Sequence, residues 1–276
     1  MGRQEPAGTD REFLRTDQYR NERNLEARRA IYRYAVEGGD FFTPALAALE
    51  GAMSVLDVGC GPGVWCDVVT RDRPGSRWVG VDLSVGMAAA AIEAGRTPVG
   101  VADAVALPVA SNAVDAGIAV HMLYHVPPDE QPAALAELAR VVRPGGPVVV
   151  TTNSADHLGE LDELLTAAGS DVGLDLPRLG FGLSFKLDDA GEALMTEAFG
   201  TVETVHARGR LAIADPDVVA GYIGSLAALP ELGADAPDED GMVEVVSAAR
   251  RRAAATIDRN GTFHVQSHAG VFIAHV

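Results

Sequence analysis

A ten-residue stretch in the first quarter of the chain, SVLDVGCGPG at Ser54–Gly63, joins a short apolar run to a carboxylate and three glycines. The glycines occupy alternate positions directly after Asp57 and the valine that follows it. Glycine has no side chain and adopts left-handed backbone conformations, so such a turn lets a ligand approach the backbone closely. Glycine-rich turns of this kind follow the first strand of many nucleotide-binding sheets. The stretch therefore predicts a ligand-binding loop at the end of a buried strand.

The spacing of the glycines narrows the class of ligand. A dinucleotide loop reads G-x-G-x-x-G and opens a helix that points at a pyrophosphate. The pattern here is Gly59-x-Gly61-x-Gly63 with Pro62 inside it. A P-loop needs G-x-x-x-x-G-K-[ST], and the only lysine of the chain is Lys186. The sequence therefore excludes a P-loop and places an NAD-dependent oxidoreductase last among the candidate functions.

Three histidines, His121, His125 and His157, fall at or soon after the ends of predicted strands. An imidazole with its ordinary pKa of about 6.5 exchanges a proton near neutral pH and suits general acid–base work. Packing or helix capping is the alternative role for each. The i, i+4 spacing of the first two would suit a metal ion, but Pro127-Pro128 prevents a helix there and no nearby carboxylate completes a ligand set. We therefore expect no metal site.

The elements that must position these residues alternate between strand and helix over the first two-thirds of the chain. Apolar runs predict strands at Ser54–Val58, Arg77–Val81, Pro98–Val101, Val114–Val120 and Pro147–Thr152, and helical spacing appears between them at Val85–Ala94 and Gln131–Val142. Strands that alternate with helices indicate a parallel sheet. The predicted fold class is therefore α/β, with a Rossmann-like, mostly parallel sheet and helices on both faces. Ligands bind at the carboxyl ends of the strands in such sheets.

After Thr152 the predicted strands and helices no longer alternate regularly. We expect a helix at His157–Ala168 and late strands at Thr201–Ala207 and Thr262–Val276, which bring the sheet to seven strands, with helices between them at Pro216–Ala228 and Met242–Thr256. The segment Arg11–Val36 is predicted to be helical. We interpret residues 1–50 as an N-terminal helical cover and 51–276 as one domain, with cover insertions at about 155–190 and 214–258. Phe185, Tyr222 and Leu226 of these insertions would line an acceptor pocket.

Composition bounds the class of partner. The 276 residues include 39 acids and 22 bases, which gives a net charge of −17 at pH 7. Nucleic-acid-binding proteins usually carry a basic stripe, so a small-molecule partner is favoured over nucleic acid.

No run reaches the roughly 18 apolar residues of a membrane span, and the polar N-terminus resembles no targeting signal. We expect a cytoplasmic monomer or homodimer. Cys60 and Cys66 lack the spacing of a redox or zinc pair and predict packing thiols.

Five ordered segments resemble the motifs of class I S-adenosylmethionine-dependent methyltransferases. The first is VLDVGCGPG. The others are VGVDLS at 79–84, VADAVALP at 101–108, HMLYHV at 121–126 and RVVRPGG at 140–146. Together they span Met53–Thr152.

The resemblance implies S-adenosylmethionine as cofactor and assigns residues to it. Asp82, next to Leu83, would hold both ribose hydroxyls, and Asp103 would reach the adenine amino group. The remaining contacts would come from the backbone at Gly59, Gly61, Ala104 and His121. The alternatives are local roles. Asp82 could cap the following helix, a role that Ser84 could fill instead, and Asp103 could form an Asx turn.

The flanks resemble a narrower set of bacterial methyltransferases. QYRNERNLEARRAI at Gln18–Ile31 is similar to the start of that set, and TTN…HLGEL at Thr151–Leu161 is similar to its segment after the fifth strand. A helix ahead of the sheet covers the cofactor in many small-molecule members. The resemblance then implies that Tyr19 lies near the sulfonium and that Arg28 pairs with the methionine carboxylate. A solvated surface helix is the alternative.

These observations lead us to expect methyl transfer from S-adenosylmethionine to an oxygen or nitrogen of a small-molecule acceptor, in specialised-metabolite (natural product) biosynthesis. His125 is the predicted general base, with Tyr124 beside it and His157 as the second candidate. A tRNA or rRNA methyltransferase is one alternative. The charge balance and the lack of an N-P-P-Y-type segment at HMLYHVPP argue against it. The other alternative is a non-catalytic S-adenosylmethionine-binding regulatory protein, which would lack an open acceptor pocket.

Overall fold

The parallel half of the sheet confirms the predicted fold class. The computed structural model of the chain describes residues 9–14, 23–178, 184–226 and 237–276. Five parallel strands lie in the order β4-β3-β2-β5-β6. They are β2 (Ser54–Val58), β3 (Arg77–Asp82), β4 (Val99–Val101), β5 (Ala116–Val120) and β6 (Pro147–Asn153). Each of the five lies where the sequence predicts a strand.

Three antiparallel strands complete the sheet beyond β6. β8 (Phe263–His275) pairs with β6, β7 (Val202–Ile213) pairs with β8, and β1 (Ala35–Gly38) pairs with β7 at the edge. The sheet therefore has eight strands, one more than the sequence predicted. The additional strand is β1, which replaces the end of the helix expected over Arg11–Val36. All of its residues are exposed, so no alternation of apolar and polar residues marks it in the sequence.

Helices cover both faces of the sheet. On one face, α3 (Phe42–Ala48) and α4 (Val64–Asp72) pack on a core that includes Trp65 and Trp78. On the other face, α6 (Gln131–Val141) and α8 (Asp189–Phe199) pack on a core that includes Leu135 and Phe272. α5 (Val85–Glu93) packs beside β3 and β4. These two cores hold the strand ends in place.

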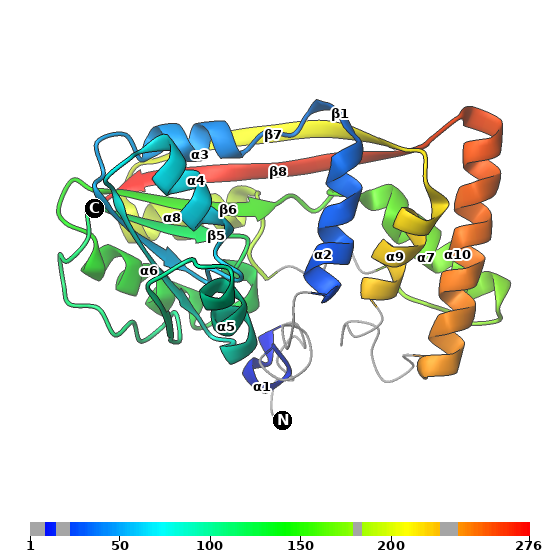
Figure 1. Cartoon of the computed structure of the whole chain (residues 1–276), viewed down its shortest axis with the longest axis horizontal. Helices are drawn as coiled ribbons and strands as arrows, with labels where there is room; N and C mark the ends of the chain where they lie inside the picture. The colour runs from blue at the N-terminus through cyan, green and yellow to red at the C-terminus, as the bar shows by residue number, and fades with distance from the viewer. Residues whose placement is uncertain (1–8, 15–22, 179–183, 227–236) are drawn as a thin grey trace.

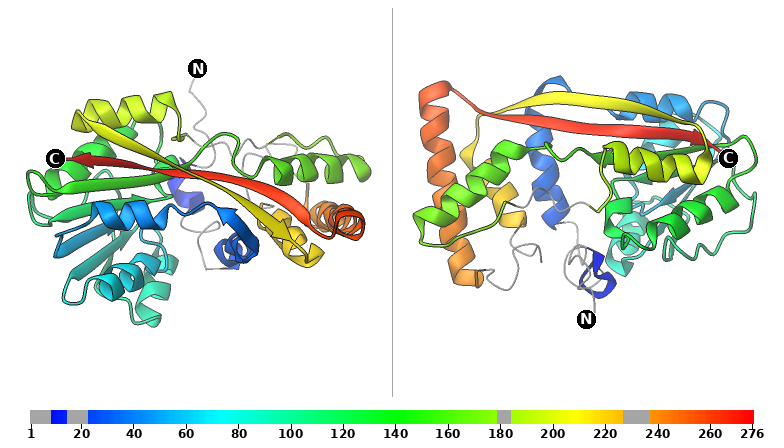
Figure 2. Two further views of the ribbon diagram at one scale, coloured as in Figure 1. Left: turned by 90° about the horizontal axis from the view of Figure 1, so that it is seen from above. Right: turned by 180° about the vertical axis from the view of Figure 1, so that it is seen from behind.

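The β7–β8 hairpin continues past the end of the parallel strands. The last pair between β6 and β8 is Asn153 with Ala269. β7 and β8 then run on through six further pairs, from Arg208 with His268 to Ile213 with Phe263. Figures 1 and 2 show this overhang as a long two-stranded ribbon that leaves the sheet. It extends the sheet on the side where the parallel strands end.

The overhang carries a separate group of helices. α7 (Gly159–Asp171), α9 (Pro216–Ser225) and α10 (Glu239–Asn260) share one apolar core with the outer halves of β7 and β8. α2 (Arg23–Ala30) packs against α9, and the short helix η3 (Ile31–Tyr34) buries Ile31 in the same core. These helices stand beyond the carboxyl ends of the parallel strands and not on a face of the sheet (Figure 1).

None of the helices in the described ranges combines the length and the apolar character needed to cross a membrane.

Replacing Phe272 by alanine should lower the free energy of unfolding by about 3–5 kcal/mol, because it empties a fully buried site in β8. Its ring contacts Phe185 edge to face at 5.7 Å between centroids. Urea unfolding followed by circular dichroism measures the change. Val243→Ala, at an exposed position of α10, is the control and should stay within about 0.5 kcal/mol of the parent. A Phe272→Ala loss below about 1 kcal/mol would contradict this packing.

Candidate active site

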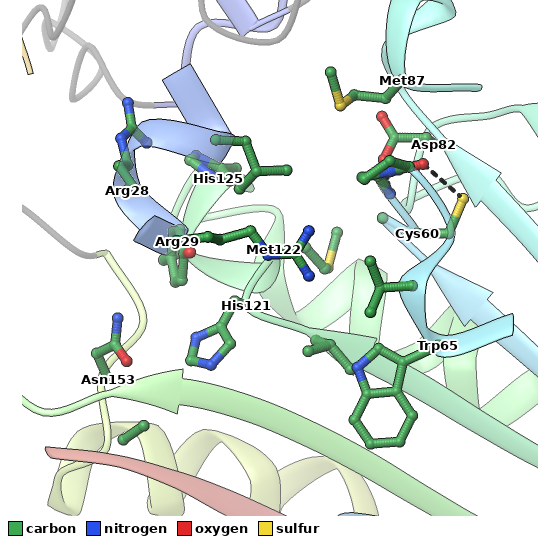
Figure 3. A pocket seen from close by; sticks show the side chains of 18 of the residues that line it. Arg28, Arg29, Cys60, Trp65, Asp82, Met87, His121, Met122, His125 and Asn153 are labelled. Carbon is green, nitrogen blue, oxygen red and sulfur yellow. Dashed lines mark hydrogen bonds between the residues drawn. The ribbon is translucent and has the colours of Figure 1, made fainter. Parts of the chain in front are cut away.

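A cavity of about 660 Å³ lies at the carboxyl ends of the parallel strands. Its wall on the sheet side comes from the loops after β2, β3, β4 and β5 and from the end of β6. Its opposite wall comes from α1 (Arg11–Phe13), α2, η3, α9 and the inner part of the β8 overhang. Figure 3 shows residues of both walls around one space. Ligand cavities of about 300–1,000 Å³ accommodate drug-sized molecules.

The glycine loop presents its backbone to this cavity. Gly59 has φ +69°, and a Cβ there would lie 2.6 Å from Cβ of Met122, so no larger residue fits without displacing that side chain. Gly61 has φ +53°, and nothing lies within 4 Å of the place that a Cβ would take. Both glycines line the cavity. The glycines are therefore used for left-handed turns and for close approach to an open space, as the sequence predicted.

Asp82 joins the glycine loop to the end of β3. Its Oδ2 accepts a hydrogen bond of 2.7 Å from the Gly61 N–H, and its Oδ1 accepts one of 2.8 Å from the Ser84 N–H. Burial raises the pKa of Asp82, and the two N–H donors partly oppose that rise. The Ser84 hydroxyl accepts from the Met87 N–H and caps α5, so Asp82 is not the cap. Each carboxylate oxygen keeps a lone pair for a ligand hydroxyl.

Asp57 is a buried carboxylate of the site that was not predicted from the sequence. It is 1% exposed and lines the cavity. Its Oδ2 accepts a hydrogen bond of 3.2 Å from Nε1 of Trp78, whereas Oδ1 has no hydrogen-bond partner among the described residues. Burial, together with the charge of Asp82, raises the pKa of Asp57 to about 8. A carboxylate inside the run SVLDV was the signal for it, because an unpaired charge is costly in a buried strand.

The end of the cavity near β4 is tied to the N-terminal segment. Nε of Arg11 donates to Oδ2 of Asp103 at 2.6 Å, and its guanidinium also pairs with Glu130. These two carboxylates raise the pKa of Arg11 above its usual value. Oδ1 of Asp103 accepts from the Val105 N–H at 3.2 Å, which is a local turn contact. The predicted cofactor residues Leu83 and Ala104 line the cavity with Asp103.

The side chains of two neighbouring arginines in α2, Arg28 and Arg29, point in different directions. Tyr19 lies outside the described residues. Arg28 donates to the backbone oxygen of Ser225 at 3.1 Å and to its hydroxyl at 3.4 Å, so it ties α2 to α9 at the edge of the cavity. In Figure 3 the Arg28 side chain is directed away from the middle of the cavity, whereas Arg29 extends into it. Arg29 was not predicted from the sequence, because the direction of each side chain depends on how the helix is rotated against α9.

The segment after β5 is part of the sheet-side wall. His121 has φ +50°, and its N–H lies 3.1 Å from both the backbone oxygen and the hydroxyl of Thr151. Desolvation in this wall lowers the pKa of the His121 imidazole to about 4, so the ring is neutral at pH 7. Tyr124 and His125 follow in the short helix η4 (Leu123–His125), with ring centroids 4.5 Å apart. All three line the cavity.

His157 reaches the same cavity from the opposite side. It is 3% exposed and precedes α7. Its Nδ1 accepts a hydrogen bond of 2.9 Å from the His268 N–H, and its Nε2 lies 2.9 Å from the Tyr32 hydroxyl. Burial is the main cause that lowers the pKa of His157 to about 3. The structure therefore brings the three predicted histidines to one cavity.

Two of the three residues predicted to line the acceptor pocket from the inserted segments do line the cavity. Tyr222 and Leu226 line the cavity from α9 and its C-cap, but Phe185 is buried in the core beside Phe272 and does not. No group of three or more potential metal ligands occurs in the described part of the chain. Cys60 and Cys66 are unpaired and buried, and burial raises the pKa of both thiols.

Comparison with known families matches the segment that forms the sheet-side wall of the cavity. A family model described as a methyltransferase domain matches residues 56–150, from within β2 to within β6. A demethylmenaquinone methyltransferase of Mycolicibacterium paratuberculosis is 42% identical over 108 residues, which are 39% of this chain and 45% of that protein. A tRNA (carboxymethyluridine(34)-5-O)-methyltransferase of Arabidopsis thaliana is 34% identical over 113 residues, 41% of this chain and 27% of that protein. A ubiquinone/menaquinone biosynthesis C-methyltransferase of Syntrophotalea carbinolica is 34% identical over 138 residues, 48% of this chain and 56% of that protein. The chain thus spans about a quarter to just over half of these relatives.

Solved structures share the fold over almost the whole chain. Phosphoethanolamine N-methyltransferase 2 of Haemonchus contortus, in complex with S-adenosyl-L-methionine, gives a TM-score of 0.55 at 20% identity, over 96% of this chain and 59% of that one. An S-adenosylmethionine-dependent methyltransferase of Thermotoga maritima, named as a possible histamine N-methyltransferase, gives 0.50 at 16% identity, over 96% and 97%. At these identities the likeness concerns the fold alone. The matched segment contains the parallel strands whose ends line the cavity, so this part of the chain is similar to a methyltransferase domain and has the fold of these S-adenosylmethionine-dependent methyltransferases.

Proposed function

We propose that the protein transfers a methyl group from S-adenosylmethionine to an oxygen or nitrogen of a small molecule in specialised-metabolite biosynthesis. The observation that carries this proposal is the second wall of the site. The N-terminal elements and α9 stand opposite the strand ends, and the cavity of about 660 Å³ between them suits two small molecules side by side. The net charge of −17 agrees with a partner other than nucleic acid.

The residues present fit the cofactor. Asp82 offers carboxylate lone pairs to a ribose diol, next to the open backbone of Gly61. The unpaired Oδ1 of Asp57 suits the ammonium group of the methionine moiety. Arg29 extends into the cavity and suits the carboxylate of that moiety. The Asp103 and Ala104 segment then takes the adenine.

The bound cofactor would supply a methyl group on a sulfonium, from which the neutral thioether S-adenosylhomocysteine leaves readily. The protein therefore has to hold the acceptor atom in line and exclude water, which is catalysis by proximity. Leu14, Met122, Leu158 and Leu226 contribute apolar surface to the cavity wall and keep water out. His121 is neutral at pH 7 and adds no positive charge beside a cationic sulfonium.

A proton must leave when the acceptor is a hydroxyl or an ammonium. We assign this step to His125, which lines the cavity from the turn after β5, with Tyr124 against its ring. His157 is less suited to the same step, because its Nδ1 lone pair already accepts the His268 N–H.

The alternatives make different demands on the same cavity. A tRNA or rRNA methyltransferase must admit a nucleotide of a long acidic chain, and one relative acts on tRNA. The ion pair between Arg11 of α1 and Asp103 narrows the access to the cavity, and the chain is acidic. Both observations favour a small-molecule acceptor. A regulatory S-adenosylmethionine-binding protein would need no second space beyond the cofactor.

Incubation with S-adenosylmethionine that carries a tritiated methyl group tests the proposal. The purified protein is given a small-molecule extract and, separately, total RNA of the source cells. Label in the small-molecule extract alone supports the proposal. Label in RNA alone, or in neither fraction with the cofactor bound, contradicts it in favour of the respective alternative.

Asp82→Ala should weaken the binding of S-adenosylmethionine and of S-adenosylhomocysteine by about 10- to 150-fold, because a charge-assisted hydrogen bond contributes about 1.5–3 kcal/mol. Isothermal titration calorimetry measures both dissociation constants. Asp240→Ala, at an exposed position of α10, is the matched control and should bind as the parent does. Equal affinity of Asp82→Ala and the parent would remove Asp82 from the site.

The ligand-free protein should lose stability as pH rises between about 4 and 8 through Asp57. The folded chain keeps a proton on Asp57 up to a pKa of about 8, whereas the unfolded chain loses it near 3.8. Raising the pH in this window therefore favours the unfolded state by up to about 1.4 kcal/mol per pH unit. Asp57→Asn should remove this part of the slope, so its stability relative to the parent should grow from pH 5 to pH 8 in urea unfolding. Parallel curves for the two proteins would show that Asp57 is ionised in the folded state.

His125→Ala should lower turnover at least tenfold and leave cofactor binding nearly unchanged, because a general base contributes about 10²–10⁴-fold. The loss should shrink at high pH, where a hydroxyl acceptor ionises unaided. The acceptor is the small molecule that takes up the tritiated methyl group in the incubation above. Single-turnover measurements with it give the rate constant for methyl transfer. His264→Ala, at an exposed position of β8, is the control. An unchanged rate constant for His125→Ala would mean that proximity alone suffices.

A further inference from the structure

Tyr32 lies in the cavity wall on the side of the helical group. Tyr32 belongs to η3, keeps 43% of its accessible surface and lines the cavity. Asn153 at the end of β6 and Ser267 in β8 line the same side. In Figure 3 Asn153 and Asp82 appear on opposite sides of the cavity, with Met122 between them. This side is therefore the one left for an acceptor when the cofactor contacts Asp82.

The hydrogen bonds of His157 fix which of its nitrogens carries the proton. The His268 N–H of the β8 backbone donates to Nδ1 at 2.9 Å, so that nitrogen has no hydrogen of its own. A neutral imidazole carries its one N–H on the other nitrogen. The N–H of His157 is therefore on Nε2, 2.9 Å from the Tyr32 oxygen, and donates to it. The neighbouring ionisable groups are Tyr32, His121, Asp156 and His268, and together with burial they leave the ring neutral.

The direction of this bond determines what Tyr32 can do. The Tyr32 oxygen accepts from His157, so its own O–H is left to donate elsewhere. Burial raises the pKa of Tyr32 above its ordinary value, so the hydroxyl is protonated at neutral pH. His157 is the one hydrogen-bond partner of this hydroxyl among the residues that the structure describes. Since Tyr32 lines the cavity, its O–H is available to a ligand there.

We propose that Tyr32 donates a hydrogen bond to the methyl acceptor and that His157 is the positioning residue that holds its hydroxyl in place. The acceptor is then a small molecule with a hydrogen-bond-accepting oxygen, carbonyl or hydroxyl, near the atom that receives the methyl group. This inference rests on the proposed small-molecule function. In this arrangement His157 orients the Tyr32 hydroxyl toward the acceptor and does not remove a proton from it.

The first test needs no acceptor. Nitrogen-15 NMR of the full chain, with the His157 signals assigned through His157→Gln, reports the protonation of each ring nitrogen. We expect a protonated Nε2 and an unprotonated Nδ1 from pH 8 down to pH 5, with and without S-adenosylhomocysteine. A proton on Nδ1, or titration of His157 inside this range, would overturn the arrangement.

The second test separates positioning from proton removal. The oxygen and nitrogen of a glutamine amide can replace the Nδ1 acceptor and the Nε2 donor of His157, but an amide cannot act as a base. His157→Gln should therefore restore most of the transfer that His157→Leu loses. Tyr32→Phe should lower kcat/KM for the labelled acceptor about tenfold at every pH tested. The dissociation constant for S-adenosylhomocysteine and the thermal midpoint should stay near those of the parent in Tyr32→Phe and His157→Gln.

The outcomes distinguish this inference from the proposed function. Transfer that is unchanged in Tyr32→Phe, or that is lost equally in His157→Gln and His157→Leu while both variants bind S-adenosylhomocysteine, overturns the inference and leaves the small-molecule function standing. A lack of label in any small molecule overturns both, even if the NMR arrangement is found.

Discussion

The overhang of the β7–β8 hairpin is the constraint on which the site depends. Parallel strands present their carboxyl ends along one edge, and that edge alone would form an open crevice. Here β7 and β8 continue for six pairs beyond the last pair of β6. They carry α7, α9 and α10, which share a core with the hairpin and support α2 and η3. The crevice therefore acquires a second wall, and the cavity lies between the two walls.

The two walls supply different kinds of functional group to the cavity. The sheet side supplies Asp57, the glycine loop and Asp82, whose carboxylates and open backbone suit a cationic nucleoside. The helical side supplies Arg29, Tyr32 and His157, of which the last two are joined by a hydrogen bond that the β8 backbone orients. The turn after β5, with His121 and His125, lines the same cavity from the sheet side. An acceptor held between this turn and Tyr32 would contact both walls at once.

Local sequence patterns predicted the sheet side well. Five apolar runs located the parallel strands, and because the ends of parallel strands meet at one edge, the sequence alone placed Gly61, Asp82 and His121 together. The helical side depended on contacts between segments distant in the sequence. Packing of α2 against α9 decides which of Arg28 and Arg29 extends into the cavity. The orientation of the His157 ring depends on a backbone N–H 111 residues away. The edge strand β1 has no buried residue, so it left no periodic signal.

A crystal structure of the full chain with S-adenosylhomocysteine would show whether the two walls hold different parts of the reaction. We expect the ligand to occupy the cavity with its ribose hydroxyls within hydrogen-bond distance of Asp82. We also expect the thioether sulfur to face the turn at His121–His125 and space to remain beside Tyr32. A ligand bound outside the cavity, or one that fills the space beside Tyr32 with its adenine, would contradict the division of the site between the two walls.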